Sequence, residues 1–153
     1  MVIVLFLTNY CKKDEASTPV TCSGGGFYYN TSNSIMIVPN AFTPNGDGLN
    51  DRFGAVGSNF SKFSMTIKDY TGTLLFADSS IVIWWDGKNT AGKIVGGHYK
   101  ANISFKNAGG SVITRAIDIM LYADSITNGG ACKFGDMINP TQGFIYNTTE
   151  KVK

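Results

Sequence analysis

The chain has 153 residues, of which 43% are hydrophobic and 16% charged, and its formal net charge is +2. This length suits one domain with short extensions, and a charge so close to zero excludes a nucleic-acid-binding protein from the expected classes. The 18 glycines and the 12% of aromatic residues favour a turn-rich β domain over a helical one.

The first residues are typical of an export segment that ends at a cysteine. Val2–Leu7 is an apolar run too short to span a bilayer, and Cys11 follows it, with a charged cluster at Lys12–Glu15. This pattern resembles a bacterial lipoprotein signal followed by the surface-export tag of Bacteroidetes lipoproteins. The resemblance implies lipid on Cys11 and an outer-membrane, cell-surface location; secretion without an anchor is the alternative.

From residue 34 onward the sequence shows the signals of short strands. Ile35–Val38 is a compact apolar run, whereas Phe63–Lys68 and Tyr99–Lys106 alternate apolar and polar side chains with the period of a half-buried strand. Turn signals at residues 69–72 and 107–110 complete two hairpins. Further strands are expected at Phe27–Tyr29, Leu74–Phe76, Ile81–Trp85, Ser111–Leu121 and Phe144–Tyr146, the last beside the first. About seven strands in the main part predict an all-β, immunoglobulin-like antiparallel β-sandwich.

The expected organisation is a signal over residues 1–11, a tether over 12–33, the sandwich over 34–122 and a C-terminal extension over 123–153.

A loop from Val38 to Phe53 contains prolines and glycines and cannot hold a long regular element, because proline fixes φ and glycine permits positive φ. Together with Trp85-Asp86-Gly87 and Tyr99, this loop resembles the gliding motility-associated C-terminal domain of Bacteroidetes. The resemblance implies a β-sandwich of cell-surface and secreted proteins that is associated with type IX secretion. The motif residues that carry it are Pro39, Asn40, Phe42, Thr43, Pro44, Asn45, Gly46, Asp47, Gly48, Asn50, Asp51, Trp85, Asp86, Gly87 and Tyr99.

Four residues of this loop are candidate calcium ligands. Asn45, Asp47, Asn50 and Asp51 place side-chain oxygens at short intervals, as calcium-binding loops do. The acidic first ligand and the bidentate acid of an EF-hand are missing, so a metal-free loop held by Asx turns is the alternative. No other cofactor is expected.

Trp84 is a candidate contact for a surface glycan. Successive residues of a strand point to opposite sides, so Trp84 is expected to be exposed if Trp85 packs in the core.

Cys22 and Cys132 are the cysteines that remain once Cys11 is set aside as the lipid site. A disulfide between them would tie the tether to the C-terminal extension and stabilise the fold by about 2–4 kcal/mol. His98 is the only histidine, and no nucleophile, acid pair or metal-ligand spacing accompanies it, so an enzyme is not expected.

We therefore predict a non-catalytic cell-surface lipoprotein whose β-sandwich has a structural or adhesive role. One alternative is the type IX secretion sorting domain of a truncated secreted protein, and another is a calcium-dependent carbohydrate-binding module. The expected partners are the outer membrane through the lipid anchor, the type IX secretion machinery and surface glycans.

Overall fold

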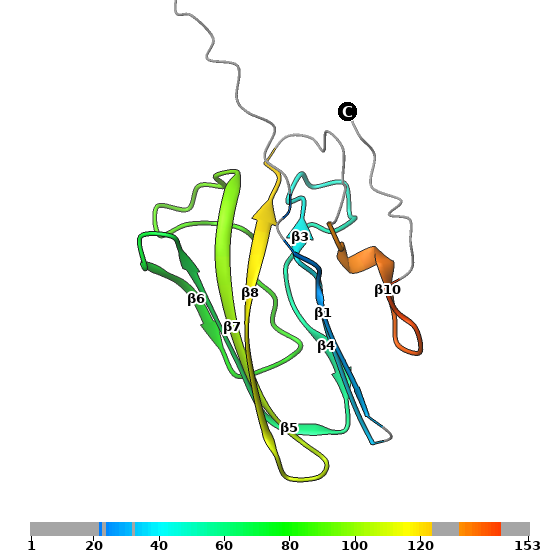
Figure 1. The fold of residues 1–153 in the computed structure, drawn as a ribbon. Coiled ribbons are helices and arrows are strands. Elements are labelled where there is room, and N and C mark those ends of the chain that lie inside the picture. The colour runs from blue at the N-terminus through cyan, green and yellow to red at the C-terminus, as the bar shows by residue number, and fades with distance from the viewer. Residues whose placement is uncertain (1–21, 23, 32, 124–131, 145–153) are drawn as a thin grey trace, which may run out of the picture.

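The computed structural model describes residues 22, 24–31, 33–123 and 132–144, which form two layers of strands (Figure 1). The first sheet has the order β1-β2-β4, with β1 at Phe27–Thr31, β2 at Ser34–Val38 and β4 at Val56–Ser58. The second sheet has the order β3-β8-β7-β5-β6, with β3 at Ala41–Phe42, β5 at Phe60–Asp69, β6 at Leu74–Asp78, β7 at Gly97–Asn107 and β8 at Val112–Leu121. All neighbours pair antiparallel except β3 and β8, which are parallel. The predicted all-β sandwich is confirmed.

The core lies between the two sheets, where the alternating side chains of the long strands point. Ile67 on β5, Ala101 on β7 and Ile119 on β8 are completely buried, and Met36 and Val38 meet them from β2. Full burial of one such aliphatic side chain stabilises the fold by about 1.5–3 kcal/mol. The period of two in the sequence therefore predicted the core face of β5, β7 and β8 correctly.

Both predicted hairpin turns are present. Between β5 and β6, the Asp69 carboxylate accepts the backbone N–H groups of Thr71 and Thr73, and Gly72 takes a φ of 90°. Between β7 and β8, the side chain of Asn107 accepts the Ser111 N–H at 2.8 Å. Short polar side chains thus close each turn locally.

The predicted strand at Ile81–Trp85 is wrong. Residues 79–96 connect β6 to β7 irregularly, and within the predicted strand only Trp85 forms a bridge, to Phe53. A second isolated bridge joins Lys88 and Ile94 further along the connection. The Asp78 carboxylate accepts the Ser80 N–H at 2.6 Å and turns the chain, and the Trp84 indole N–H bonds back to the Ile81 carbonyl oxygen. The apolar run therefore folds on itself, because these local hydrogen bonds replace a ladder.

The C-terminal extension packs against the sandwich. It contains a three-residue helical turn, η1 (Gly135–Met137), and a hairpin of β9 (Ile138–Asn139) and β10 (Gly143–Phe144). The expected strand at Phe144–Tyr146 is thus represented by β10, which pairs with β9 rather than β1; residues 145 and 146 lie outside the described part. Its loop still contacts β1, since the Tyr28 hydroxyl donates to the Thr141 carbonyl oxygen at 3.1 Å.

A second apolar cluster holds the extension in place. Tyr122, Cys132, Phe134 and Met137 are buried there with Met120 of β8. Within the described ranges, no helix has the length and apolar character needed to cross a membrane.

Candidate functional site

The motif loop begins where the chain passes from one sheet to the other, between β2 and β3. Asn40 lies at this crossing with 1% of its surface exposed. Its side-chain NH₂ donates to the Gly24 carbonyl oxygen at 3.0 Å, and its side-chain oxygen accepts the Lys133 N–H at 2.6 Å. Its backbone donates to the Lys133 carbonyl oxygen and accepts the Met120 N–H at 2.8 Å. Asn40 therefore joins the entry segment, the extension and β8 at one buried point.

Three aromatic motif residues pack together beside the crossing at Asn40, and we call this region of the structure the corner. The ring centroid of Trp85 lies 5.3 Å from Phe42 and 5.1 Å from Tyr99, the latter edge-on. The polar atoms are satisfied locally: the Trp85 indole N–H donates to the Lys88 carbonyl oxygen at 3.0 Å, and the Tyr99 hydroxyl donates to the Val95 carbonyl oxygen at 2.6 Å. Burial raises the pKa of Tyr99 above its ordinary value, with smaller contributions from Tyr70 and Asp69. Trp85 is 3% exposed, so it packs in the core as expected.

Gly87 completes the corner from the far side. Its φ is 82°, and a Cβ at this position would lie 3.0 Å from Pro44, 3.1 Å from Leu121 and 3.2 Å from Phe42. The preceding residue, Asp86, has its pKa lowered chiefly by the hydrogen bond from the Lys88 side chain. Glycine is required here for both its backbone conformation and its size.

The carboxylates of the loop are occupied by the loop's own backbone and side chains. Asp51 accepts the Gly46 N–H at 2.6 Å with one oxygen and the Gly48 N–H at 2.8 Å with the other. Asp47 accepts the Asn45 side-chain NH₂ at 3.2 Å and the backbone N–H two residues on, while the Asn45 side-chain oxygen accepts the Asp47 N–H. The bonds of Asn45 and Asp47 to the N–H two residues on are the Asx turns of the metal-free alternative, and Asp51 closes the loop by accepting from residues before it.

Asn50, the remaining candidate ligand, points to the extension. Its side-chain oxygen accepts the Asp136 N–H at 2.9 Å, and its φ of 49° places it in the left-handed region. Within the described ranges, no group of three or more His, Cys, Asp or Glu side chains could hold a metal ion. Calcium binding by this loop remains a hypothesis.

Thr43 differs from its neighbours in the motif. It is 2% exposed, and its hydroxyl oxygen has no hydrogen-bond partner among the described residues. Its backbone is fully used, since the N–H donates to the Asn50 carbonyl oxygen and the carbonyl accepts the Asn45 N–H. The side chain therefore contributes packing rather than a polar contact.

Trp84 lies at a hollow of about 470 Å³ between the motif loop and the extension. Arg52, Asp51 and Asp136 also line this hollow. Trp84 is half-buried, because one face of its indole packs on Gly54, where a Cβ would come within 2.4 Å of the ring. The candidate glycan contact and the candidate calcium loop are thus adjacent, a proximity that the sequence analysis did not predict.

Cys22 and Cys132 form a disulfide with their Cα atoms 5.3 Å apart and 110 positions apart in sequence. The predicted pairing is therefore present, and it joins Cys22, which lies before β1 in the chain, to the described part of the extension. Cys11, the predicted lipid site, lies outside the described residues.

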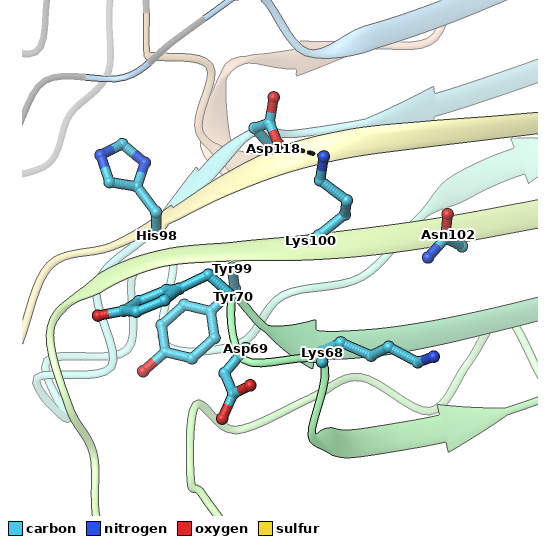
Figure 2. A pocket seen from close by; sticks show the side chains of 9 residues that line it. Lys68, Asp69, Tyr70, His98, Tyr99, Lys100, Asn102 and Asp118 are labelled. Atoms are coloured by element: carbon cyan, nitrogen blue, oxygen red, sulfur yellow. Dashed lines mark ion pairs between the residues drawn. The ribbon is translucent and has the colours of Figure 1, made fainter.

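His98 lies on the outer face of the five-stranded sheet, in a hollow that Asp69 and Asp118 also line (Figure 2). Asp118 is paired with Lys100 at 3.3 Å. Hydrogen bonds led by the one from the Thr71 hydroxyl lower the pKa of Asp69. Both carboxylates have other partners, so the arrangement does not form an acid–base pair with the histidine.

Sequence reasoning missed the long-range contacts of the motif. The side chains of Asn40 and Asn50 both accept backbone N–H groups of the extension, from Lys133 and Asp136. The signals that pointed there were the cysteine pair and the apolar residues Phe134 and Met137, which a segment without packing partners would not need.

The structure is therefore a disulfide-linked β-sandwich in which the motif residues make contacts that hold the fold together. A family model, the CHU_C type IX secretion signal domain, matches residues 36–117, more than half of the chain. The chain belongs to this family, and the predicted resemblance to a type IX-associated β-sandwich is confirmed. Such a signal domain marks a protein that is secreted or held at the cell surface.

No curated protein matches the chain. A solved structure of PorZ, an essential bacterial surface component of the type IX secretion system of Porphyromonas gingivalis, matches with 17% identity and a TM-score of 0.32. The match covers 64% of this chain and 11% of that one. This likeness is too low to support a functional argument.

Proposed function

We propose that this chain is a non-catalytic module of the type IX secretion pathway that is displayed on the outer surface through lipid on Cys11, where its sandwich has a structural or adhesive role. The observation that supports it best is the Cys22–Cys132 disulfide. Disulfides form and persist in oxidising compartments and are rare in the cytosol, so a disulfide that closes the fold favours a protein that finishes folding after export.

The hydrogen bonds of the motif residues support the proposal that the module is non-catalytic. Their polar side chains close the motif loop and hold the sheet crossing, as with Asp51 and Asn40. A catalytic acid or base needs a proton site open to substrate, and these groups are engaged by the fold.

A second candidate function is a sorting signal that the type IX machinery reads directly. It is favoured by the family match, which lies over the sandwich, residues 36–117, rather than over the export segment or the extension. In this case the anchor at Cys11 would be dispensable.

The experiment expresses the full chain and its Cys11→Ser variant in a host with a working type IX system, with labelled palmitate and external protease. We expect palmitate on the wild-type chain only, and loss of the cell-bound, protease-accessible protein in the variant. Cys11→Ser protein that stays on the surface in equal amount, with no label on either chain, would overturn the anchor.

The sorting alternative is tested separately in the same host. If the protein loses its surface exposure when the type IX system is disabled but keeps it in the Cys11→Ser variant, the sandwich is the sorting signal and the lipid is not required.

A further inference from the structure

The outer face of the five-stranded sheet carries an open groove of about 460 Å³ (Figure 2). It crosses β5, β7 and β8 on the side opposite the core, because Tyr99 and Ala101 of β7 point inward while the residues between and beside them point out. The residues that line the groove include Lys68, Tyr70, His98, Lys100, Asn102 and Asp118. None of these six is a motif residue of the buried corner.

Strand pairing leaves the ammonium group of Lys68 without an ion-pair partner among the described residues. Lys68 of β5 lies directly opposite Lys100 of β7, and Lys100 lies opposite Asp118 of β8. Like charges at directly opposed positions destabilise a sheet. Asp118 pairs with Lys100 at 3.3 Å, whereas Lys68 forms no ion pair with any described residue. An anion placed beside Lys68 would relieve this repulsion.

The other carboxylate at the groove does not serve Lys68. Asp69 is in the turn, where its Oδ1 accepts the Thr71 hydroxyl at 2.6 Å and the N–H groups of Thr71 and Thr73, each at 2.9 Å. The groove also offers several hydrogen-bond donors to a ligand, because the amide of Asn102 and the imidazole of His98 lie beside the two lysines.

Tyr70 gives the groove an aromatic end. Its side chain is 85% exposed at the tip of the turn, so it contributes little to the core. Gly72 follows on the same turn, and nothing lies within 4 Å of where its Cβ would be, which leaves the rim open. An exposed ring with a polar tip offers an apolar face to a sugar ring and a hydroxyl to its polar edge.

We propose that this groove binds an acidic glycan, with a sugar carboxylate at Lys68 and a sugar ring stacked on Tyr70. The unpaired ammonium group of Lys68 favours a carboxylated sugar over a neutral one, and the open shape of the groove suits an extended chain. The site is separate from Trp84, which lies at the motif loop. It does not depend on the lipid anchor or on export, so a purified protein can test it while leaving the proposed function untouched.

The test is calorimetric titration of the purified full-length chain with hexagalacturonate and with its fully methyl-esterified form. We expect saturable binding of the acid and at least about tenfold weaker binding of the ester. Lys68→Ala should weaken binding of the acid about fivefold, and Tyr70→Ala about tenfold. Tyr70→Phe, which keeps the ring, should restore most of the affinity.

Lys106→Ala is the matched control. Lys106 lies on the same strand as Lys100, an even number of positions away, but it lines a different hollow at the other end of the sheet. The variant removes the same charge and should bind like the wild type. Equal weakening by Lys106→Ala and Lys68→Ala, equal binding of acid and ester, or no binding of either would overturn the proposal. Unchanged urea midpoints would establish that the variants are folded.

Discussion

The contrast between Asn40 and Thr43 tests whether the motif acts through hydrogen bonds at the sheet crossing. Both residues are buried and belong to the same motif, but their side chains differ in what they bond. Asn40 exchanges two hydrogen bonds with Gly24 and Lys133, at 3.0 and 2.6 Å. The Thr43 hydroxyl has no partner among the described residues.

The expected magnitudes follow from this difference. Asn40→Ala removes two hydrogen bonds, each with a net value of about 0.5–1.5 kcal/mol, and leaves the Lys133 N–H without its side-chain acceptor, at a further cost of about 1 kcal/mol or more. The free energy of unfolding should fall by about 2–4 kcal/mol. Thr43→Val keeps the shape and removes an unpaired buried hydroxyl, so stability should stay within about 0.5 kcal/mol of the wild type or rise by about 1 kcal/mol.

Urea denaturation of the oxidised protein, followed by tryptophan fluorescence, measures both changes. Asn102→Ala provides the control: the Asn102 side chain is exposed on β7 and makes no hydrogen bond to any described residue, so the change should cost little. The reasoning would be refuted if Asn40→Ala unfolded within about 0.5 kcal/mol of wild type, or if Thr43→Val were as destabilising as Asn40→Ala.

Four further outcomes are expected. Replacing Cys22 and Cys132 with serine should lower the free energy of unfolding by about 2–5 kcal/mol, and identical urea midpoints with and without the disulfide would contradict this. Gly87→Ala should cost about 1–3 kcal/mol more than Gly72→Ala: both positions have positive φ, but only the first lacks room for a Cβ, so equal losses would argue against the packed corner. Because burial raises the folded-state pKa of Tyr99, the contribution of its hydroxyl to stability should be complete below about pH 10 and be lost as the pH rises through the folded-state pKa. The free energy of unfolding should therefore fall less steeply at alkaline pH in Tyr99→Phe than in the wild type. Parallel falls in the two proteins would contradict this assignment. Since the oxygens of the motif loop already accept hydrogen bonds from the loop itself, Tm should be the same in excess calcium and in chelator, whereas a rise of several degrees with calcium would support the metal site.

Much of the sandwich was predictable because its information is local. The alternation in β5, β7 and β8 fixes which side chains face the core, and the polar residues at the turns close each hairpin within a few positions. Ile81–Trp85 has a similar apolar composition, yet Asp78 and the Trp84 indole turn it into an irregular connection. Composition therefore did not distinguish a strand from a segment that bonds to itself.

The site was less predictable, because its contacts join distant parts of the chain. Oxygen spacing in the motif loop is the same whether the side chains face a cation or their own backbone, so only the structure shows Asp51 bonded to Gly46 and Gly48. The bond from the extension to Asn40 spans 93 positions. No periodicity marks such a contact, and its signs in the sequence were the cysteine pair and the apolar residues Phe134 and Met137 of the extension.

The most direct test of the account compares the surface exposure of the full chain in two isogenic hosts, one with and one without a working type IX secretion system. The account predicts that external protease degrades the protein in the first host and leaves it intact in the second. Equal degradation in both hosts would contradict the central claim that this β-sandwich works in type IX secretion.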